Sequence, residues 1–215
     1  MNFNVINIEN WDRKDYFYHY YTNARCTYSV TANVDITQIY NFCKEKNYRL
    51  YPVLIWWIAN AANNFQFMRF NHNAKGEVGY YDVVNPSFTY MPKSSEKFNV
   101  LWCPYNKDFS TFYNKCVEIM DNTEAGARMF PMDDMPSNCF DISSIPWIEF
   151  TSFNLNLYTS GTWLAPIITT GKLIKENGTV KLPFSLQVHH SVCDGYHTAQ
   201  YYAFLQKTAD DINNW

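Results

Sequence analysis

The chain has 215 residues, of which 47% are hydrophobic and 19% aromatic, so it can bury a substantial core, and we expect one domain over residues 1–215. Its 17 basic and 20 acidic residues give a net charge of -3 with no basic run, which argues against a nucleic-acid partner. The sequence has no stretch of 18 apolar residues and no basic segment followed by an apolar one, so we expect no membrane span, no secretory signal and a cytoplasmic location.

Apolar periodicity predicts helices and strands in mixed order along the first part of the chain. We expect a helix over residues 11–21, a strand over 27–33, a helix capped by Asp35 or Thr37, and a helix over 51–64. The capped helix would place on one face Ile36, Ile39, Tyr40 and Cys43. The 51–64 segment is apolar almost all round, which predicts a buried helix.

Short strands and one amphipathic helix are expected in the middle of the chain. Residues 77–84, 87–91 and 98–102 have the composition of strands, and residues 108–120 have helical spacing. The apolar face of that helix would contain Phe109, Phe112, Tyr113 and Cys116. Residues 126–136 include two prolines and two aspartates, which predicts a loop.

The C-terminal part predicts a hairpin turn, a strand and a helix. Asn177-Gly178 is typical of a two-residue hairpin turn, and alternation over residues 180–188 predicts a half-buried strand. After Gly195 the apolar spacing becomes helical. The face of that helix would contain Tyr196, Ala199, Tyr202, Ala203, Leu205 and Ile212. The whole pattern indicates an α/β fold, a two-layer sandwich in which helices pack on one face of a mixed sheet.

The segment His-His-Ser-Val-Cys-Asp-Gly, residues 189–195, lies between this strand and this helix. Such rigid neighbours can aim an imidazole accurately. A lone histidine is most often a structural residue, and that interpretation applies to either of the pair. The interpretation we favour is acyl transfer, in which one histidine is a general base that deprotonates a substrate hydroxyl, so the nucleophile belongs to the substrate.

Two other chemistries fit the same segment less well. Zinc would require ligands from His189, His190, Asp194 and His197, yet adjacent strand residues point to opposite faces, so the first two cannot easily share a metal. A Ser-His-Asp hydrolase would use Ser191 as its nucleophile. The G-x-S-x-G elbow is absent, and the three members lie too close in sequence to converge easily.

The cysteines form no C-x-x-C pair and have no zinc spacing, which favours reduced thiols. They are Cys26, Cys43, Cys103, Cys116, Cys139 and Cys193. The last lies inside the 189–195 segment, but a thiolate nucleophile needs a lowered pKa, and the sequence supplies no cationic neighbour.

The pattern H-H-x-x-x-D-G, followed by an aromatic residue and a histidine, resembles the signature of the chloramphenicol acetyltransferase family. The core pattern is similar to that of dihydrolipoamide acyltransferase cores and peptide-synthetase condensation domains, so the motif alone does not separate these groups. The likeness to chloramphenicol acetyltransferases extends nearly end to end. It includes residues 10–14, 16–17, 26–29, 34–37, 50–52, 142–147, 152–157 and 166–169. The resemblance implies the coenzyme A-dependent acyltransferase fold.

The resemblance also implies roles for individual residues. His190 would be the general base, and His189 would be structural. Ser143 would donate a hydrogen bond to the oxyanion of the tetrahedral intermediate, and Thr169 would support the same intermediate through water.

The motif aspartate, Asp194, would pair with Arg13 and hold the loop, in preference to forming a His-Asp dyad. Gly195 would serve a backbone turn that a side chain would strain.

The substrates and assembly implied by the resemblance are acetyl-coenzyme A as co-substrate, chloramphenicol as acceptor, no metal, and a homotrimer whose active sites lie between subunits. The matching acceptor-pocket positions are Tyr20, Cys26, Phe98, Phe130, Phe153, Leu155 and Ile167. The expected activity is acetylation of the primary hydroxyl of chloramphenicol, which gives antibiotic resistance. Open alternatives are an acetyltransferase of the same fold for another hydroxylated small molecule, a non-catalytic binder of an aromatic drug, and an assembly core like that of the dihydrolipoamide acyltransferases.

Overall fold

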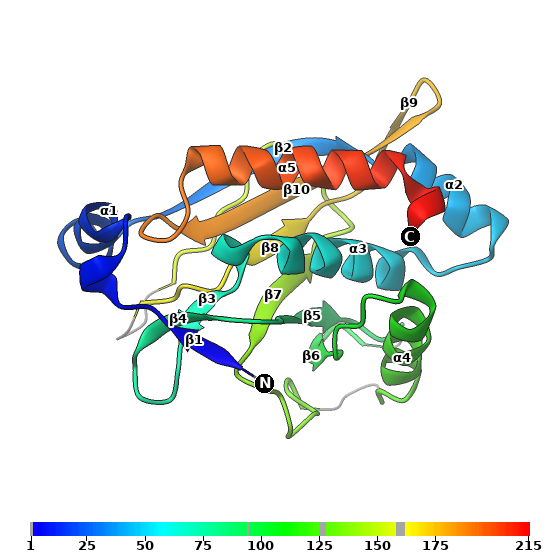
Figure 1. Ribbon diagram of the computed structural model, residues 1–215. Helices are drawn as coiled ribbons and strands as arrows, with labels where there is room; N and C mark the ends of the chain where they lie inside the picture. Colours follow the sequence, from blue (N-terminus) through cyan, green and yellow to red (C-terminus); the bar gives the residue numbers. More distant parts are fainter. Residues whose placement is uncertain (1, 94, 125–127, 158–161) are drawn as a thin grey trace.

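The computed structural model describes residues 2–93, 95–124, 128–157 and 162–215. Its centre is a seven-stranded mixed sheet with the order β2-β10-β8-β7-β5-β6, and β9 pairs with β10 (Figure 1). The strands are β2 (Thr27–Asp35), β5 (Asn85–Tyr90), β6 (Asn99–Trp102), β7 (Cys139–Ser144), β8 (Ile167–Thr170), β9 (Ile174–Glu176) and β10 (Thr179–His189). Strand β7 runs parallel to β5 and β8, while β10 runs antiparallel to β2 and β8.

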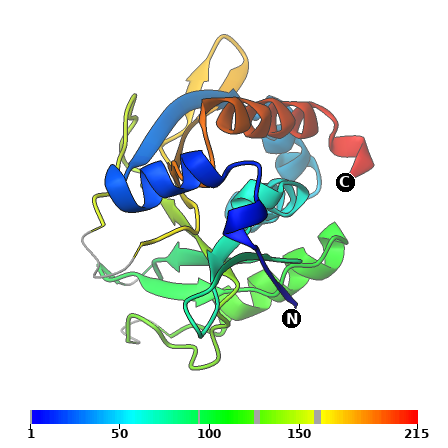
Figure 2. The same ribbon diagram turned by 60° about the vertical axis from the view of Figure 1, so that its left-hand side comes forward.

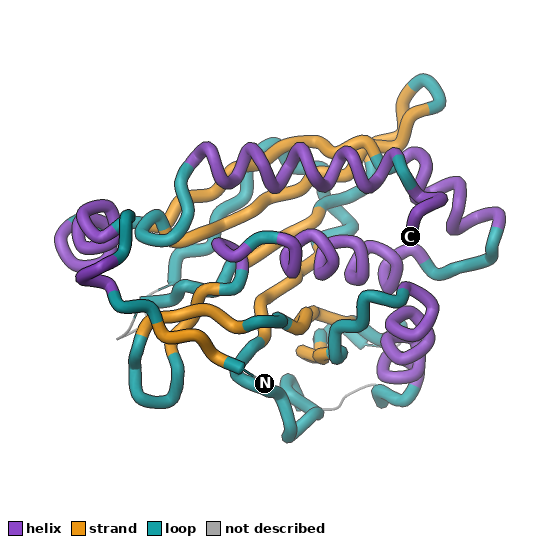
Figure 3. Tube along the Cα trace, viewed as in Figure 1, coloured by secondary structure: helices purple, strands orange, loops and turns teal. Residues whose placement is uncertain are grey.

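Helices form a second layer against one face of this sheet (Figures 1 and 3). They are α2 (Thr37–Glu45), α3 (Leu50–Asn64), α4 (Phe109–Asp121) and α5 (Gly195–Asp210). Helix α3 lies in the middle and buries most of its side chains, Trp57 completely. Opposite it, Phe88, Ile142, Ile168 and Leu186 come from four adjacent strands and are almost fully buried. The expected two-layer α/β architecture is therefore confirmed.

Helix boundaries in this layer follow the predictions closely. Helix α3 contains Pro52 in its first turn, where a missing N–H costs nothing. Helix α4 begins after Asp108, whose side chain accepts a hydrogen bond from Thr111 N. At α2 the residue directly before the helix is Ile36, which is neither of the two predicted capping residues. The side chain of Asp35 nevertheless accepts a hydrogen bond from the first helical N–H, that of Thr37, at 2.9 Å.

Helix α5 is confirmed, but its predicted face is only partly right: of the six predicted residues Leu205 is fully buried, and Tyr202 is partly buried against the core. The side chains that α5 buries are Thr198, Tyr201, Leu205 and Ala209. Tyr196 is 71% exposed, and Ile212 lies beyond the end of the helix in a short 3₁₀ turn. At its start the buried face lies two positions after the predicted one. The polar Thr198 is buried there, and its hydroxyl donates to Gly195 O at 2.9 Å.

Strand β10 was expected to be half-buried, and this expectation is wrong, since both of its faces are buried from Leu182 to His189. The face away from the helices carries polar side chains that the segment 153–155 covers. Ser185 Oγ donates to Phe153 O at 2.8 Å, and Gln187 Oε1 accepts from Leu155 N at 2.8 Å. The polar residues of the alternation are therefore buried with hydrogen-bond partners.

The N-terminal region departs most from the predictions. The helix expected over residues 11–21 is α1 (Lys14–Tyr18), which continues as a π-helical turn over His19–Asn23. A small three-stranded sheet of β1 (Phe3–Val5), β4 (Val78–Tyr81) and β3 (Phe70–His72) lies nearby. Only β4 was expected there, and it is shorter than the predicted 77–84. Figure 2 shows α1 beside the end of β10.

The remaining predictions agree to within a few residues. Strand β2 extends two residues past the expected 27–33, and β5 and β6 occupy the expected positions 87–91 and 98–102 with shifted ends. The Asn177-Gly178 turn is confirmed, with positive φ values of 50° and 80°. Residues 126 and 127 of the expected 126–136 loop lie outside the described residues, and 128–136 has no helix or strand. Across the described ranges, no helix is long and apolar enough to cross a membrane.

Candidate active site

His190 immediately follows β10 and is held by aromatic rings. Its imidazole is stacked on the ring of Tyr20, with ring centroids 3.8 Å apart and an angle of 5° between the planes. The ring centroid of Tyr28 lies 5.0 Å from that of the imidazole. The backbone N–H of His190 donates to Cys26 O at 2.9 Å. The Nδ1 atom is buried and has no hydrogen-bond partner in the described part of the chain. Tyr20 and Cys26, both predicted acceptor-pocket residues, thus lie against His190.

The neighbouring His189 is 4% exposed and belongs to the interior. Its Nδ1 lies 2.7 Å from Ser191 Oγ. Burial, with smaller contributions from nearby His190 and His72, lowers the pKa of His189 to about 4, so this imidazole is neutral at pH 7. Its surroundings match the structural role expected for the first histidine of the pair.

The alternative chemistries of the 189–195 segment are disfavoured by this geometry. Ser191 is completely buried and pairs with His189, so it cannot meet a substrate as a hydrolase nucleophile. Burial raises the pKa of Cys193 to about 12, which keeps it a thiol. No group of three His, Cys, Asp or Glu side chains suited to a metal ion occurs among the residues described.

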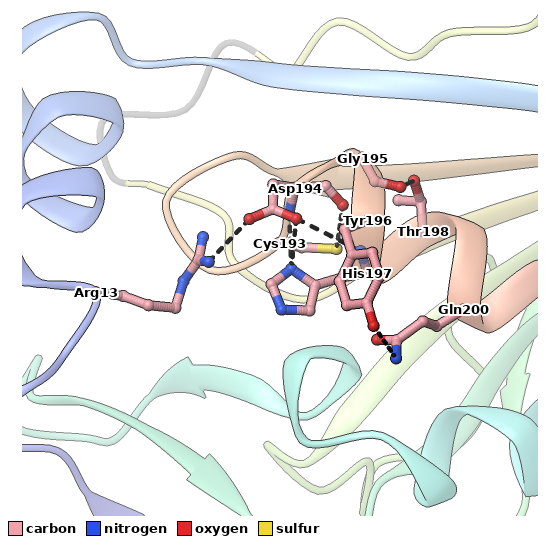
Figure 4. A network of polar contacts seen from close by, with 8 residues as sticks. All are labelled: Arg13, Cys193, Asp194, Gly195, Tyr196, His197, Thr198 and Gln200. Atoms are coloured by element: carbon pink, nitrogen blue, oxygen red, sulfur yellow. Dashed lines mark hydrogen bonds and ion pairs between the residues drawn. The ribbon is translucent and has the colours of Figure 1, made fainter.

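An ion pair joins the N-terminal helical segment to the loop that follows His190 (Figure 4). Arg13 Nη1 lies 2.9 Å from Asp194 Oδ2, so the expected pairing of these two side chains is confirmed. Asp194 also caps α5, and its Oδ1 lies 2.8 Å from Nδ1 of His197. Burial acts to raise the pKa of Asp194, but the hydrogen bond from Arg13 and the nearby charges outweigh it, and the net pKa is lowered.

Gly195 does not serve the strained backbone turn that was expected for it. Gly195 is the first residue of α5, its φ lies outside the left-handed region, and no atom lies within 4 Å of the position that a Cβ would take. A side chain there would not strain the turn, because the backbone conformation is accessible to any L-residue and the space around the Cβ position is open.

Ser143 and Thr169 lie side by side on the sheet face that points away from the helices. They are register partners on the parallel strands β7 and β8. Ser143 Oγ lies 3.4 Å from Thr89 Oγ1, and Thr169 is 2% exposed. Ser143 opens onto a groove of about 1120 Å³, whose lining includes Phe98, an expected acceptor residue.

The other predicted acceptor residues are distributed over this face. Phe153 and Leu155 belong to the segment that covers β10, and Ile167 of β8 lines a second cavity of about 170 Å³. Phe130 is 50% exposed and lies in the loop before β7. One chain therefore does not gather the seven expected acceptor residues into one enclosed pocket.

His190 and Ser143 lie at opposite ends of the sheet within one chain. Ser143 is level with Thr169, which is level with Ser185 of β10. His190 follows Ser185 by five residues, just past the end of β10, and β10 is two strands away from β7, so the backbones of His190 and Ser143 are about 15–20 Å apart. Neither described cavity includes His190 in its lining. The two candidate groups cannot act on one bound substrate within a single chain.

The sequence did not predict the contacts that three residues of this region make, namely His197, Gln187 and Tyr28. The spacing Asp194 to His197 is that of a capping box and would have indicated their contact. Gln187 binds the segment 153–155 through Leu155 N. Tyr28 contacts His190 because β2 pairs with β10, which brings Tyr28 opposite Val188. No local sequence signal marks these last two.

Comparisons with known proteins identify the family of the chain. The profile of the family described as Chloramphenicol acetyltransferase matches residues 1–206. A chloramphenicol acetyltransferase of Clostridium butyricum is 44% identical over 215 residues, which is 100% of this chain and 98% of that protein. A chloramphenicol acetyltransferase of Clostridium perfringens is 42% identical, with the same coverage of both chains.

Solved structures share the fold. A chloramphenicol acetyltransferase superposes with a TM-score of 0.86 at 24% identity, covering 96% of this chain and 99% of its own. The cubic core of a pyruvate dehydrogenase multienzyme complex superposes with a TM-score of 0.68 at 18% identity, over 87% of this chain and 83% of that one. The expected coenzyme A-dependent acyltransferase fold is thereby confirmed. With a matching family profile and relatives above 40% identity along its whole length, the chain belongs to the chloramphenicol acetyltransferase family.

Proposed function

We propose that this chain, acting as one unit over residues 1–215, is a chloramphenicol O-acetyltransferase that confers resistance to the antibiotic in the cytoplasm. It would transfer the acetyl group of acetyl-coenzyme A to the primary hydroxyl of chloramphenicol. The observation that carries the proposal is the full-length similarity to chloramphenicol acetyltransferases, combined with an imidazole held by Tyr20 at the end of β10.

In the proposed mechanism His190 acts as the general base. Because Nδ1 is the buried nitrogen, we assign this role to Nε2. It removes the hydroxyl proton as the oxygen attacks the thioester carbonyl, and Ser143 Oγ donates a hydrogen bond to the resulting oxyanion. The intermediate collapses to the acetyl ester, and the imidazolium returns its proton to the departing coenzyme A thiolate. Thr169 supports the same intermediate through water.

The separation of His190 from Ser143 supports an active site built by two subunits. A homotrimer with cyclic symmetry would place the His190 of one chain against the Ser143 of the next, three times over. Such a site would also bring Tyr20 and Cys26 of one chain to Phe98, Phe130 and the remaining acceptor residues of the other. The 15–20 Å separation within one chain would then have a simple explanation.

The groove beside Ser143 suits the coenzyme. Its walls are largely apolar, and its lining includes the cations Lys172 and Lys175 together with the carboxylates Glu96 and Glu149. Lys172 lies 3.2 Å from Glu149 at the exposed rim, so it would have to exchange this partner for a phosphate group. The acceptor side of the site is rich in aromatic and aliphatic groups. A neutral aryl alcohol is therefore favoured over a polycationic aminoglycoside, whose charges would have to be desolvated there.

The direct test is to incubate the protein with acetyl-coenzyme A and chloramphenicol and to follow the release of free thiol. We expect turnover that falls at least about 100-fold in His190→Ala. Turnover of another alcohol but not of chloramphenicol would identify the same-fold alternative. Tight chloramphenicol binding with no thiol release from any alcohol would identify the protein as a binder and refute the proposed activity.

A further inference from the structure

Two adjacent tyrosines of the π-helical turn His19–Asn23 contact different histidines. Tyr20 is stacked on His190, while the Tyr21 hydroxyl lies 2.7 Å from Nε2 of His72. The Tyr21 ring is also stacked on Phe17 of α1, with centroids 4.6 Å apart. The two contacts face different parts of the molecule, since His190 follows the main sheet and His72 ends the small sheet.

The π-helical turn couples these contacts mechanically. Its defining hydrogen bond runs from Ala24 N to His19 O at 2.8 Å and encloses both tyrosines. Successive side chains in a helical turn have a fixed angular offset, so a rotation that moves the ring of Tyr21 also moves the ring of Tyr20. Whatever fixes Tyr21 therefore fixes the surface against which His190 rests.

His72 is suited to hold Tyr21. It lies in β3 opposite Val78 of β4, and its backbone N–H donates to Asn71 Oδ1 at 2.8 Å. Burial lowers the pKa of His72, which favours the neutral ring at pH 7. The Nε2 atom of a neutral ring can accept a hydrogen bond from the Tyr21 hydroxyl. The small sheet thus provides a fixed acceptor for the turn.

The same helical segment has a second attachment at its start. Arg13 precedes α1 and pairs with Asp194, four residues after His190. The Arg13 contact limits the position of the segment, but it lies more than one helical turn before Tyr20. The ring of Tyr21 also lies edge-on to His189, with centroids 6.1 Å apart, and is stacked on Phe17, but ring contacts of this kind allow sliding. The hydrogen bond from Tyr21 to His72 is the directional contact of this side chain, so it is the one that can set the rotation of the π-helical turn.

We propose that Tyr21 and His72 are positioning residues for catalysis: their hydrogen bond orients Tyr20 and, through the stacked ring, the imidazole of His190. Neither side chain needs to touch a substrate. The inference rests on the proposed function for its kinetic consequence, but the geometric coupling itself does not depend on it.

Three variants and one matched control test the kinetic consequence. Tyr21→Phe and His72→Phe remove the hydrogen bond between the two side chains and keep an aromatic ring at each position. His72→Gln keeps an amide oxygen that can accept a hydrogen bond from the Tyr21 hydroxyl. Tyr81→Phe is the control. Tyr81 lies in the same small sheet, and this change removes the 2.9 Å hydrogen bond between its hydroxyl and Ser137 Oγ. We expect kcat to fall about tenfold in the two Phe variants at these positions, with both KM values within about twofold, since misplacement of a catalytic group affects turnover more than binding. His72→Gln and Tyr81→Phe should keep near wild-type kcat.

A nuclear magnetic resonance measurement tests the geometry without activity. The chain has five histidines, so selective labelling and comparison with His190→Ala assign the His190 ring protons. Stacking on Tyr20 should shift these protons upfield, and the shift should shrink in Tyr21→Phe and His72→Phe but not in Tyr81→Phe or His72→Gln.

Unchanged His190 shifts in the two Phe variants would overturn the inference, as would lower melting temperatures with an unchanged kcat. An inactive wild-type protein would instead refute the proposed function, and the chemical shifts would still decide whether the coupling exists.

Discussion

Arg13 and Asp194 are separated by 181 positions in the sequence, yet Nη1 of the arginine lies 2.9 Å from Oδ2 of the aspartate. The pair joins the segment that carries Tyr20 to the loop that follows His190. The Nε and Nη2 atoms of Arg13 are buried and have no hydrogen-bond partner within the ranges that the structure describes, so Asp194 provides the charge that balances this guanidinium.

Arg13→Ala and Asp194→Asn should therefore have similar effects. Each should destabilise the protein by about 2 kcal/mol, less than the 3–5 kcal/mol typical of a fully buried pair because both side chains retain some solvent contact. The double variant should be no less stable than the worse single variant. Thermal unfolding of all four proteins at one concentration measures this, and additive losses would show that the contact contributes nothing.

Ser143→Ala should lower kcat by roughly 100-fold and leave the KM values for both substrates nearly unchanged. The proposed hydrogen bond forms with the oxyanion and hardly at all with the ground state, so its loss affects turnover only. Steady-state kinetics with each substrate varied in turn provides the measurement. A raised KM with an unchanged kcat would make Ser143 a binding residue.

The helices and strands of the layered fold could be predicted from sequence where the spacing of apolar residues clearly indicates one type of element. Helix α3 is apolar all round because it is covered on every side, and its predicted bounds are nearly those observed. The π-helical turn His19–Asn23 could not be predicted, because neighbouring contacts, among them Tyr20 on His190, stabilise an irregular turn that no spacing rule encodes.

Burial of polar groups was also beyond local sequence reasoning. Ser185 and Gln187 alternate with apolar residues as a solvent-facing row does, but the segment 153–155 covers them and satisfies their hydrogen bonds. The proposed roles of Ser143 and Thr169 rest on the family resemblance alone. Their side-by-side placement follows from the parallel pairing of β7 and β8, which tertiary structure determines.

The protein should lose stability as the pH falls below neutrality, and His189 should account for a large share of the loss. Burial lowers its pKa to about 4, whereas an unfolded histidine has a pKa near 6.5, so the unfolded chain binds more protons between these values. The stabilisation is complete above pH 6.5 and disappears as the pH falls through 4. His189→Gln should reduce proton uptake on unfolding by up to about one proton per chain in this window. Denaturant unfolding at several pH values tests this. If the free energy of unfolding changed with pH as steeply in His189→Gln as in the wild type, His189 would not be the group responsible.

The most direct test of an active site shared between subunits is complementation of two inactive chains. His190→Ala and Ser143→Ala chains, each with a different affinity tag, would be co-expressed, and the mixed oligomers purified through both tags. In a cyclic trimer, every mixed assembly contains one site with an intact His190 from one chain and an intact Ser143 from its neighbour, so thiol release should recover to roughly one third of the wild-type rate. Mixed oligomers no more active than the two parent variants would contradict the account, because they would place both residues of each site in the same chain.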